Sequence, residues 1–197
     1  MMRALDQLAP KGGWLATPPG LSGELWRYYR GAYGFDPKDN ERNEARVGLG
    51  RMLFFDKRLS RDRTVSCASC HDPKFGFSEP RDRSAGIDGQ TTSRNAPTLM
   101  NAAFQRSMFW DGRRGTLEDQ AAGPILNPME MGMPDGAAVE GRVKEVPEYV
   151  ALFEFAYSRP PTFEDISRAL AAFPRAVSAR RQRLQRRRRC QDRAAVR

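Results

Sequence analysis

One histidine is present among the 197 residues, and it directly follows two cysteines three positions apart: Cys67, Cys70 and His71 form the segment Cys-Ala-Ser-Cys-His. On one helical turn the two sulfurs lie on a common face, so both can form thioether bonds to the same flat ligand. The adjacent imidazole can then bind a metal ion at the centre of that ligand. This spacing is the attachment pattern for c-type haem, and it predicts a short helix carrying one covalent haem c, with His71 as the iron ligand.

The single histidine also restricts the alternatives. It excludes a metal site with two histidines and a haem held by two histidines of this chain. A zinc site would need a fourth ligand, for which only Cys190 offers another thiolate. A thioredoxin-like dithiol would need a preceding strand. A disulfide between Cys67 and Cys70 would leave the adjacent histidine unexplained, so covalent haem is the favoured hypothesis.

The formal net charge of +9 is concentrated at one end of the chain. Residues 174–197 contain ten arginines and one aspartate, so the preceding 173 residues carry equal numbers of basic and acidic side chains. The Arg-rich segment has no aromatic residue for base stacking and is expected to be disordered. We therefore expect no specific nucleic-acid partner, although a basic nucleic-acid-binding protein is a third hypothesis. No apolar run approaches the roughly 18 residues of a membrane span.

Apolar spacing predicts a mainly α fold with long loops, because helical periods recur and no alternating strand pattern or internal repeat is found. Thr116 and Thr162 each precede an aspartate by three positions and are predicted helix starts. Pro124 and Pro128 are expected to limit the first of these helices. The remaining expectations are helices at residues 41–55, 67–71, 148–157 and 164–173, a short packed helix around Leu25, Trp26, Tyr28 and Tyr29, a cap at Ser66 or Thr64, and a long loop at residues 72–94.

Three further motifs follow the Cys-Ala-Ser-Cys-His segment in order: Arg-Asn-Ala-Pro-Thr, Phe-Trp-Asp-Gly-Arg and Asn-Pro-Met-Glu-Met. Together the four motifs resemble those of the bacterial di-haem cytochrome c peroxidases and the related methylamine-utilisation di-haem enzymes. The resemblance implies a cytochrome c-like haem domain at residues 41–173, after an N-terminal extension at residues 1–40 and before the Arg-rich segment.

The resemblance also implies roles for individual residues. Cys67 and Cys70 match the haem anchors, and His71 matches the proximal ligand of the peroxidatic haem. Asn95 matches a ligand of a calcium ion between two domains, which makes calcium a possible second cofactor. The catalytic residues are expected to be Glu130 as the distal acid–base group, Gln120 and Pro124 in the distal pocket, and Trp110 between two haems.

Glu130 has a chemical argument of its own. Cleaving a bound peroxide requires one group to take a proton from the inner oxygen and return it to the outer oxygen as that oxygen leaves. A carboxylate can do both, and no distal histidine is available because the single histidine is proximal.

The sixth position on the iron separates two functions. An open position binds peroxide, whereas a methionine sulfur there makes an electron carrier. Met129, Met131 and Met133 are candidates for such a ligand. Family peroxidases often place a histidine in the loop after the motif; the matching place here, near Ile87, has none. We therefore expect a resting haem that is open to peroxide.

The sequence also departs from the family. It has no second C-x-x-C-H, so we expect the C-terminal haem domain of the family to be missing, and the abrupt change at Pro174 suggests a frameshift. Trp110, Gln120 and one face of the last helix are then expected to be partly uncovered, which favours self-association.

The expected function is reduction of hydrogen peroxide with electrons from a c-type cytochrome or cupredoxin. The alternative is a mono-haem electron-transfer protein or an inactive haem-binding fragment. Covalent haem c implies the periplasm, yet the first residues lack the apolar segment of an export signal. An upstream in-frame extension that encodes such a segment is therefore expected.

Overall fold

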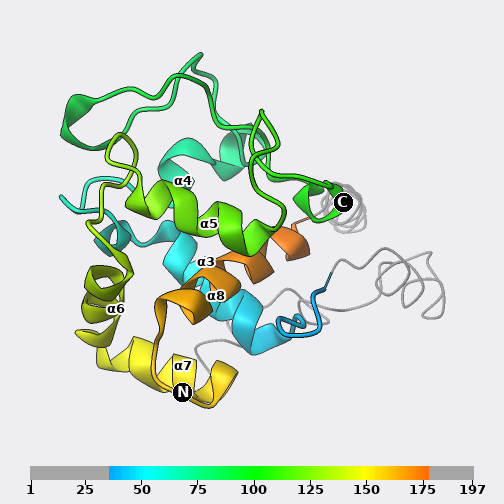
Figure 1. The fold of residues 1–197 in the computed structure, drawn as a ribbon, viewed down its shortest axis with the longest axis vertical. Coiled ribbons are helices and arrows are strands. Elements are labelled where there is room, and N and C mark those ends of the chain that lie inside the picture. Colours follow the sequence, from blue (N-terminus) through cyan, green and yellow to red (C-terminus); the bar gives the residue numbers. More distant parts are fainter. Residues whose placement is uncertain (1–35, 178–197) are drawn as a thin grey trace, which may run out of the picture.

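The computed structural model describes residues 36–177, which form helices and loops (Figure 1). Among these residues the extended structure is limited to isolated bridges, so the prediction of a mainly α fold is confirmed. The expected helix near Trp26 and most of the Arg-rich segment lie outside the described residues. The helices are α3 (Glu44–Phe55), α4 (Cys67–Cys70), α5 (Leu117–Leu126), α6 (Gly136–Lys144), α7 (Pro147–Tyr157) and α8 (Phe163–Ala176), with short 3-10 turns η1 (Lys57–Leu59), η2 (Pro73–Phe75), η3 (Ile87–Gly89) and η4 (Ala102–Phe104).

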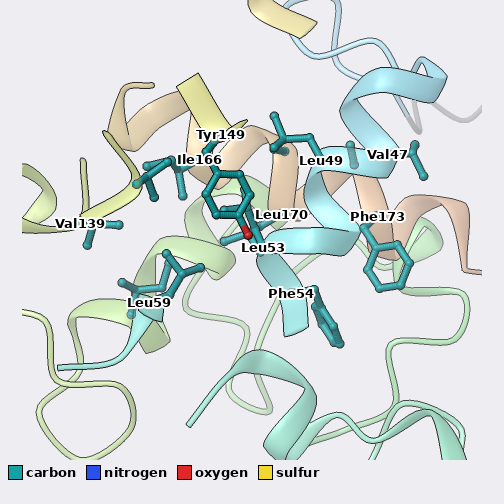
Figure 2. Packing of buried hydrophobic residues seen from close by; sticks show 14 of the residues in the cluster. Val47, Leu49, Leu53, Phe54, Leu59, Val139, Tyr149, Ile166, Leu170 and Phe173 are labelled. Carbon is teal, nitrogen blue, oxygen red and sulfur yellow. The ribbon is translucent and has the colours of Figure 1, made fainter. Parts of the chain in front are cut away.

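Helices α3 and α8 cross at the centre of the fold. Their backbones come so close that a Cβ on Gly50 would lie 1.9 Å from the carbonyl oxygen of Ala169, so only glycine fits there. Figure 2 shows Leu53 of α3 and Leu170 of α8 within this core, with Tyr149 of α7 nearby. The apolar spacing that predicted these helices therefore marks the faces that pack together.

Helix starts follow the capping pattern of the sequence. The side chains of Thr116 and Thr162 accept hydrogen bonds from backbone N–H groups three residues later, as predicted. Asn43 caps α3 in the same way, which explains why this helix begins at Glu44 and not at residue 41. Ser66 is the N-cap of α4, and its own N–H donates to the hydroxyl of Ser69 at 3.0 Å.

Two prolines lie inside helices and do not interrupt them. Pro124 belongs to α5, which continues to Leu126, and Pro174 belongs to α8, which continues to Ala176. Each proline removes one N–H donor from its helix, and each helix ends two residues after its proline. Pro124 was expected to limit its helix; the helix continues past Pro124 but ends less than one turn later, at Leu126.

The C-terminal turn of α8 is buried, although the sequence places it in the Arg-rich segment. The guanidinium of Arg175 donates to both carboxylate oxygens of Glu118, at 2.5 and 2.7 Å, and Asn40 donates to the same carboxylate at 2.6 Å. Val177 also belongs to the core. Packed structure thus extends past Phe173, the domain end expected from the motif resemblance.

The expectation that α8 leaves one face uncovered is wrong. Residues Ala169 to Arg175 of α8 are all buried, because α3, α5, α6 and η4 surround the helix. Trp110 is 62% exposed, as expected, and Gln120 is half-buried. No helix within residues 36–177 has the length and apolar character needed to cross a bilayer.

Candidate cofactor site

A cavity of about 410 Å³ is lined by residues of α4 and α5 and of the loops between and after these two helices. Its volume is in the range of roughly 300–1,000 Å³ that is usual for ligand and cofactor pockets. The eight residues that the sequence assigns to haem attachment, calcium binding and catalysis all line this one cavity: Cys67, Cys70, His71, Asn95, Trp110, Gln120, Pro124 and Glu130.

Helix α4 forms one wall. Cys67 and Cys70 are its first and last residues, and neither forms a disulfide. Burial raises the pKa of the Cys67 thiol to about 12. The pKa of Cys70 is also raised, first by burial and then by the charge of Glu79. Both sulfurs are therefore uncharged thiols on the cavity wall.

His71 follows α4 as its C-cap, and its ring orientation is fixed by a backbone contact. Its Nδ1 lies 3.2 Å from the carbonyl oxygen of Phe77. A carbonyl can only accept, so Nδ1 carries the proton and Nε2 keeps its lone pair. Burial lowers the pKa of His71, which favours this neutral form. Such an Nδ1 contact is typical of metal-binding histidines.

These observations fit a covalent haem c. Two unpaired thiols and a neutral imidazole line a single cavity of suitable size. The zinc and dithiol alternatives gain no support among residues 36–177, where no group of three His, Cys, Asp or Glu side chains could hold a metal ion and no strand precedes α4. Cys190, the fourth ligand that the zinc hypothesis needs, lies outside the described residues.

The wall formed by α5 and the turn after it carries the proposed distal residues. Gln120 and Pro124 are four positions apart, so both lie on the same face of α5. Glu130 is half-buried, and burial raises the pKa of its carboxyl despite the hydrogen bond from Asn127 and the charge of Arg113. The site therefore holds a carboxyl group with an increased tendency to keep a proton.

The loop between η4 and α5 forms a third wall. The indole Nε1 of Trp110 donates to the backbone carbonyl of Asn95 at 3.0 Å, which joins this loop to the Arg-Asn-Ala-Pro-Thr segment. Asp111 pairs with Arg94 at 3.0 Å and with Arg113 at 2.9 Å. Trp110 thus sits on the cavity wall with its ring largely in solvent.

Three contributing residues were not predicted from the sequence. Asn127 and Arg113 act on Glu130, and both lie inside motifs already noted. Glu79 has a buried carboxylate that accepts from the hydroxyl of Ser84 and, at 2.8 Å, from the N–H of Ala96. It thereby ties together two cavity-lining segments, and no local pattern in the sequence indicates this.

The methionine candidates differ in position. Met129 and Met131 line the cavity. Met133 is not among the lining residues and is 2% exposed in the hydrophobic core. The sulfur of Met133 is therefore removed as a candidate iron ligand, whereas the other two remain.

Among the described residues, Asn95 is not part of a group of carboxylates that could hold a calcium ion. Calcium usually takes six to eight oxygen ligands, with carboxylates prominent among them. The part of the chain that the structure describes has no cluster of acidic side chains arranged for a metal ion. The described residues alone therefore do not make a calcium site, and Asn95 as a calcium ligand stays a prediction.

Comparison with known proteins agrees with this geometry. The model of the family described as di-haem cytochrome c peroxidase matches residues 44–192. The methylamine utilization protein MauG of Paracoccus denitrificans is 40% identical over 156 residues, which cover 70% of this chain and 40% of that protein. The cytochrome c peroxidase Ccp of Escherichia coli is 39% identical over 132 residues, 67% of this chain and 28% of that one.

Solved structures are similar to this chain over a comparable stretch. A MauG-like protein associated with microbial copper homeostasis superposes with a TM-score of 0.68 and 36% identity, covering 73% of this chain and 43% of that one. The chain therefore spans about two fifths or less of the length of these relatives.

Proposed function

Because the chain belongs to the di-haem cytochrome c peroxidase family, we propose that the domain that begins at residue 41 and includes the buried end of α8 up to Val177 is a haem c domain that reduces hydrogen peroxide. Residues 1–40 would be an N-terminal extension, and the Arg-rich segment would follow Val177. The observation that carries the proposal is the single cavity, which has the thiols and imidazole of the attachment motif on one wall and Glu130 on another.

Cys67 and Cys70 would hold haem c covalently, and Nε2 of His71 would bind its iron. When bound, haem c supplies a centre that binds peroxide and accepts electrons from a donor. Glu130 takes the proton from the inner oxygen of peroxide and delivers it to the outer oxygen, which leaves as water. Gln120 and Pro124 line the same cavity and shape the space beside the carboxyl.

Two electrons and two protons convert one hydrogen peroxide into two waters, so an electron donor is needed. We propose a c-type cytochrome or a cupredoxin for this role. Electrons from this donor would reach the cavity by way of Trp110, whose exposed ring lies on the cavity wall. Covalent haem c is attached outside the bacterial inner membrane, which supports a periplasmic location.

The test compares the haem-loaded wild type with Glu130→Gln. The amide is nearly the same size but cannot shuttle a proton, so peroxide consumption with a reducing dye should fall by roughly 10²- to 10⁴-fold. Covalent haem content, measured as the pyridine haemochrome, should be unchanged. Peroxide consumption equal to that of the wild type would reject the proposal.

Met129 and Met131 support a second candidate, a mono-haem electron carrier. In that case a methionine sulfur would fill the sixth position, and Glu130→Gln would leave redox cycling unaffected. The absorption spectrum of the oxidised protein separates the two candidates, because a methionine ligand gives a low-spin spectrum and an open position a high-spin one.

A further inference from the structure

The carboxyl group of Glu130 is oriented by one neighbouring side chain. Nδ2 of Asn127 donates a hydrogen bond to Oε1 of Glu130 at 2.7 Å. Hydrogen bonds to a charged acceptor are short and strong, so this contact fixes which carboxylate oxygen faces the amide.

The amide of Asn127 cannot turn around without losing contacts. Its Oδ1 accepts from the N–H of Met129 at 3.0 Å, and an N–H can only donate, so the oxygen must face Met129 and the nitrogen must face Glu130. The backbone of Asn127 is held as well, because its N–H donates to the carbonyl of Gly123 in α5 and its carbonyl accepts from the N–H groups of Glu130 and Gly132. The donor is therefore presented to Glu130 by a turn bonded to the end of α5.

The Glu130 backbone is fixed from the opposite side. The N–H of Ile87 donates to the carbonyl of Glu130 at 3.0 Å. Gly86 packs so closely that a Cβ there would lie 1.8 Å from the carbonyl oxygen of Met129. With its backbone held between two segments, Glu130 can change position only through its side-chain torsions, and Asn127 restrains those.

We infer that Asn127 is a positioning residue for Glu130: it occupies Oε1 and so leaves Oε2 as the oxygen that carries the proton to and from peroxide. This inference rests on the proposed function of Glu130. A proton on Oε1 would oppose the Nδ2–H donor, whereas a proton on Oε2 leaves that hydrogen bond intact. The amide thereby directs proton exchange to one oxygen.

The discriminating variant is Asn127→Asp in the full chain loaded with haem c. Aspartate keeps an oxygen for the N–H of Met129 but replaces the donor facing Oε1 with an acceptor. The kcat for peroxide with a reducing dye should fall roughly 10- to 100-fold while KM changes less than about twofold, because orientation and not binding is lost. Asn127→Ser, which also keeps an acceptor for the turn, is the second variant.

A second readout does not depend on turnover. Hydrogen cyanide must lose its proton before it binds ferric iron, so a well-placed base speeds its association. Cyanide association should slow in both Asn127 variants, with haemochrome content and thermal unfolding unchanged. Gln90→Ala is the matched control, because it removes a donor to the carbonyl of Pro128 in the same turn and does not touch the carboxyl.

The outcomes separate the two claims. If Glu130→Gln reduces turnover and cyanide association but the Asn127 variants match the wild type, the role of Asn127 is rejected and the proposed function stands. If Glu130→Gln itself has no effect, both are rejected. The double variant Asn127→Asp/Glu130→Gln should be no slower than Glu130→Gln alone, and an additive further loss would contradict action through Glu130.

Discussion

At the scale of single residues, the two thiols of α4 make haem attachment directly testable. Cys67→Ser and Cys70→Ser should each retain haem through one thioether, so the pigment stays with the protein in acidified acetone. The double variant should release its pigment completely. Haem retained covalently by the double variant would show attachment elsewhere, for example at Cys190.

Single residues also show where sequence reasoning succeeds. Cys67, Cys70 and His71 were predictable because their chemistry is contained in five consecutive positions. The donor of Asn127 to Glu130 spans only three positions, yet it needed the structure, since many asparagines near a glutamate make no such contact. The role of Glu79 could not be predicted from the sequence, because Glu79 and Ala96, which it contacts, are 17 positions apart in the chain.

At the scale of elements, the site depends on the close contact between the loop at η3 and the turn after α5. The backbone of Gly86 is extended, a conformation that any residue could adopt. Glycine is required at this position only because a side chain would collide with the backbone of Met129. Gly86→Ala should separate the two segments and displace Glu130, lowering peroxide turnover at least roughly 10-fold. Gly141→Ala, at an open position of α6, is the control, and equal turnover in both variants would contradict this reasoning.

The helices were predictable to different degrees. Helix α5 was predictable from its capping threonine, and α8 was predictable from a capping threonine together with regular apolar spacing. Helix α6 was missed because it contains two glycines and buries only Val139 and Val143. Its formation depends on packing against its neighbours, which no local pattern encodes.

At the scale of the whole molecule, the ion pair between Glu118 and Arg175 joins α5 to the end of α8. Burial alone would raise the pKa of Glu118, but the hydrogen bonds from Arg175 and Asn40 outweigh it and lower the pKa. A carboxyl with a depressed folded-state pKa stabilises the fold above its unfolded pKa of about 4.3, and this stability is lost as pH falls through the folded value.

Glu118→Gln should therefore lower the free energy of unfolding at pH 7 by about 3 kcal/mol, since it leaves the buried guanidinium without its charge partner. The difference from the wild type should begin to shrink as pH falls below the unfolded pKa of about 4.3, and it should be lost as pH falls through the lower folded-state pKa of Glu118. Urea unfolding at several pH values measures both effects. Glu154→Gln, exposed on α7, is the control, and a pH-independent difference would refute the assignment.

The buried guanidinium at the end of α8 also bears on how this domain should be expressed. A product stopped after Phe173 would keep the carboxylate of Glu118 and the amide of Asn40 in place while discarding their cation and the apolar side chain of Val177. Cloning boundaries for a stable recombinant fragment therefore belong downstream of position 177.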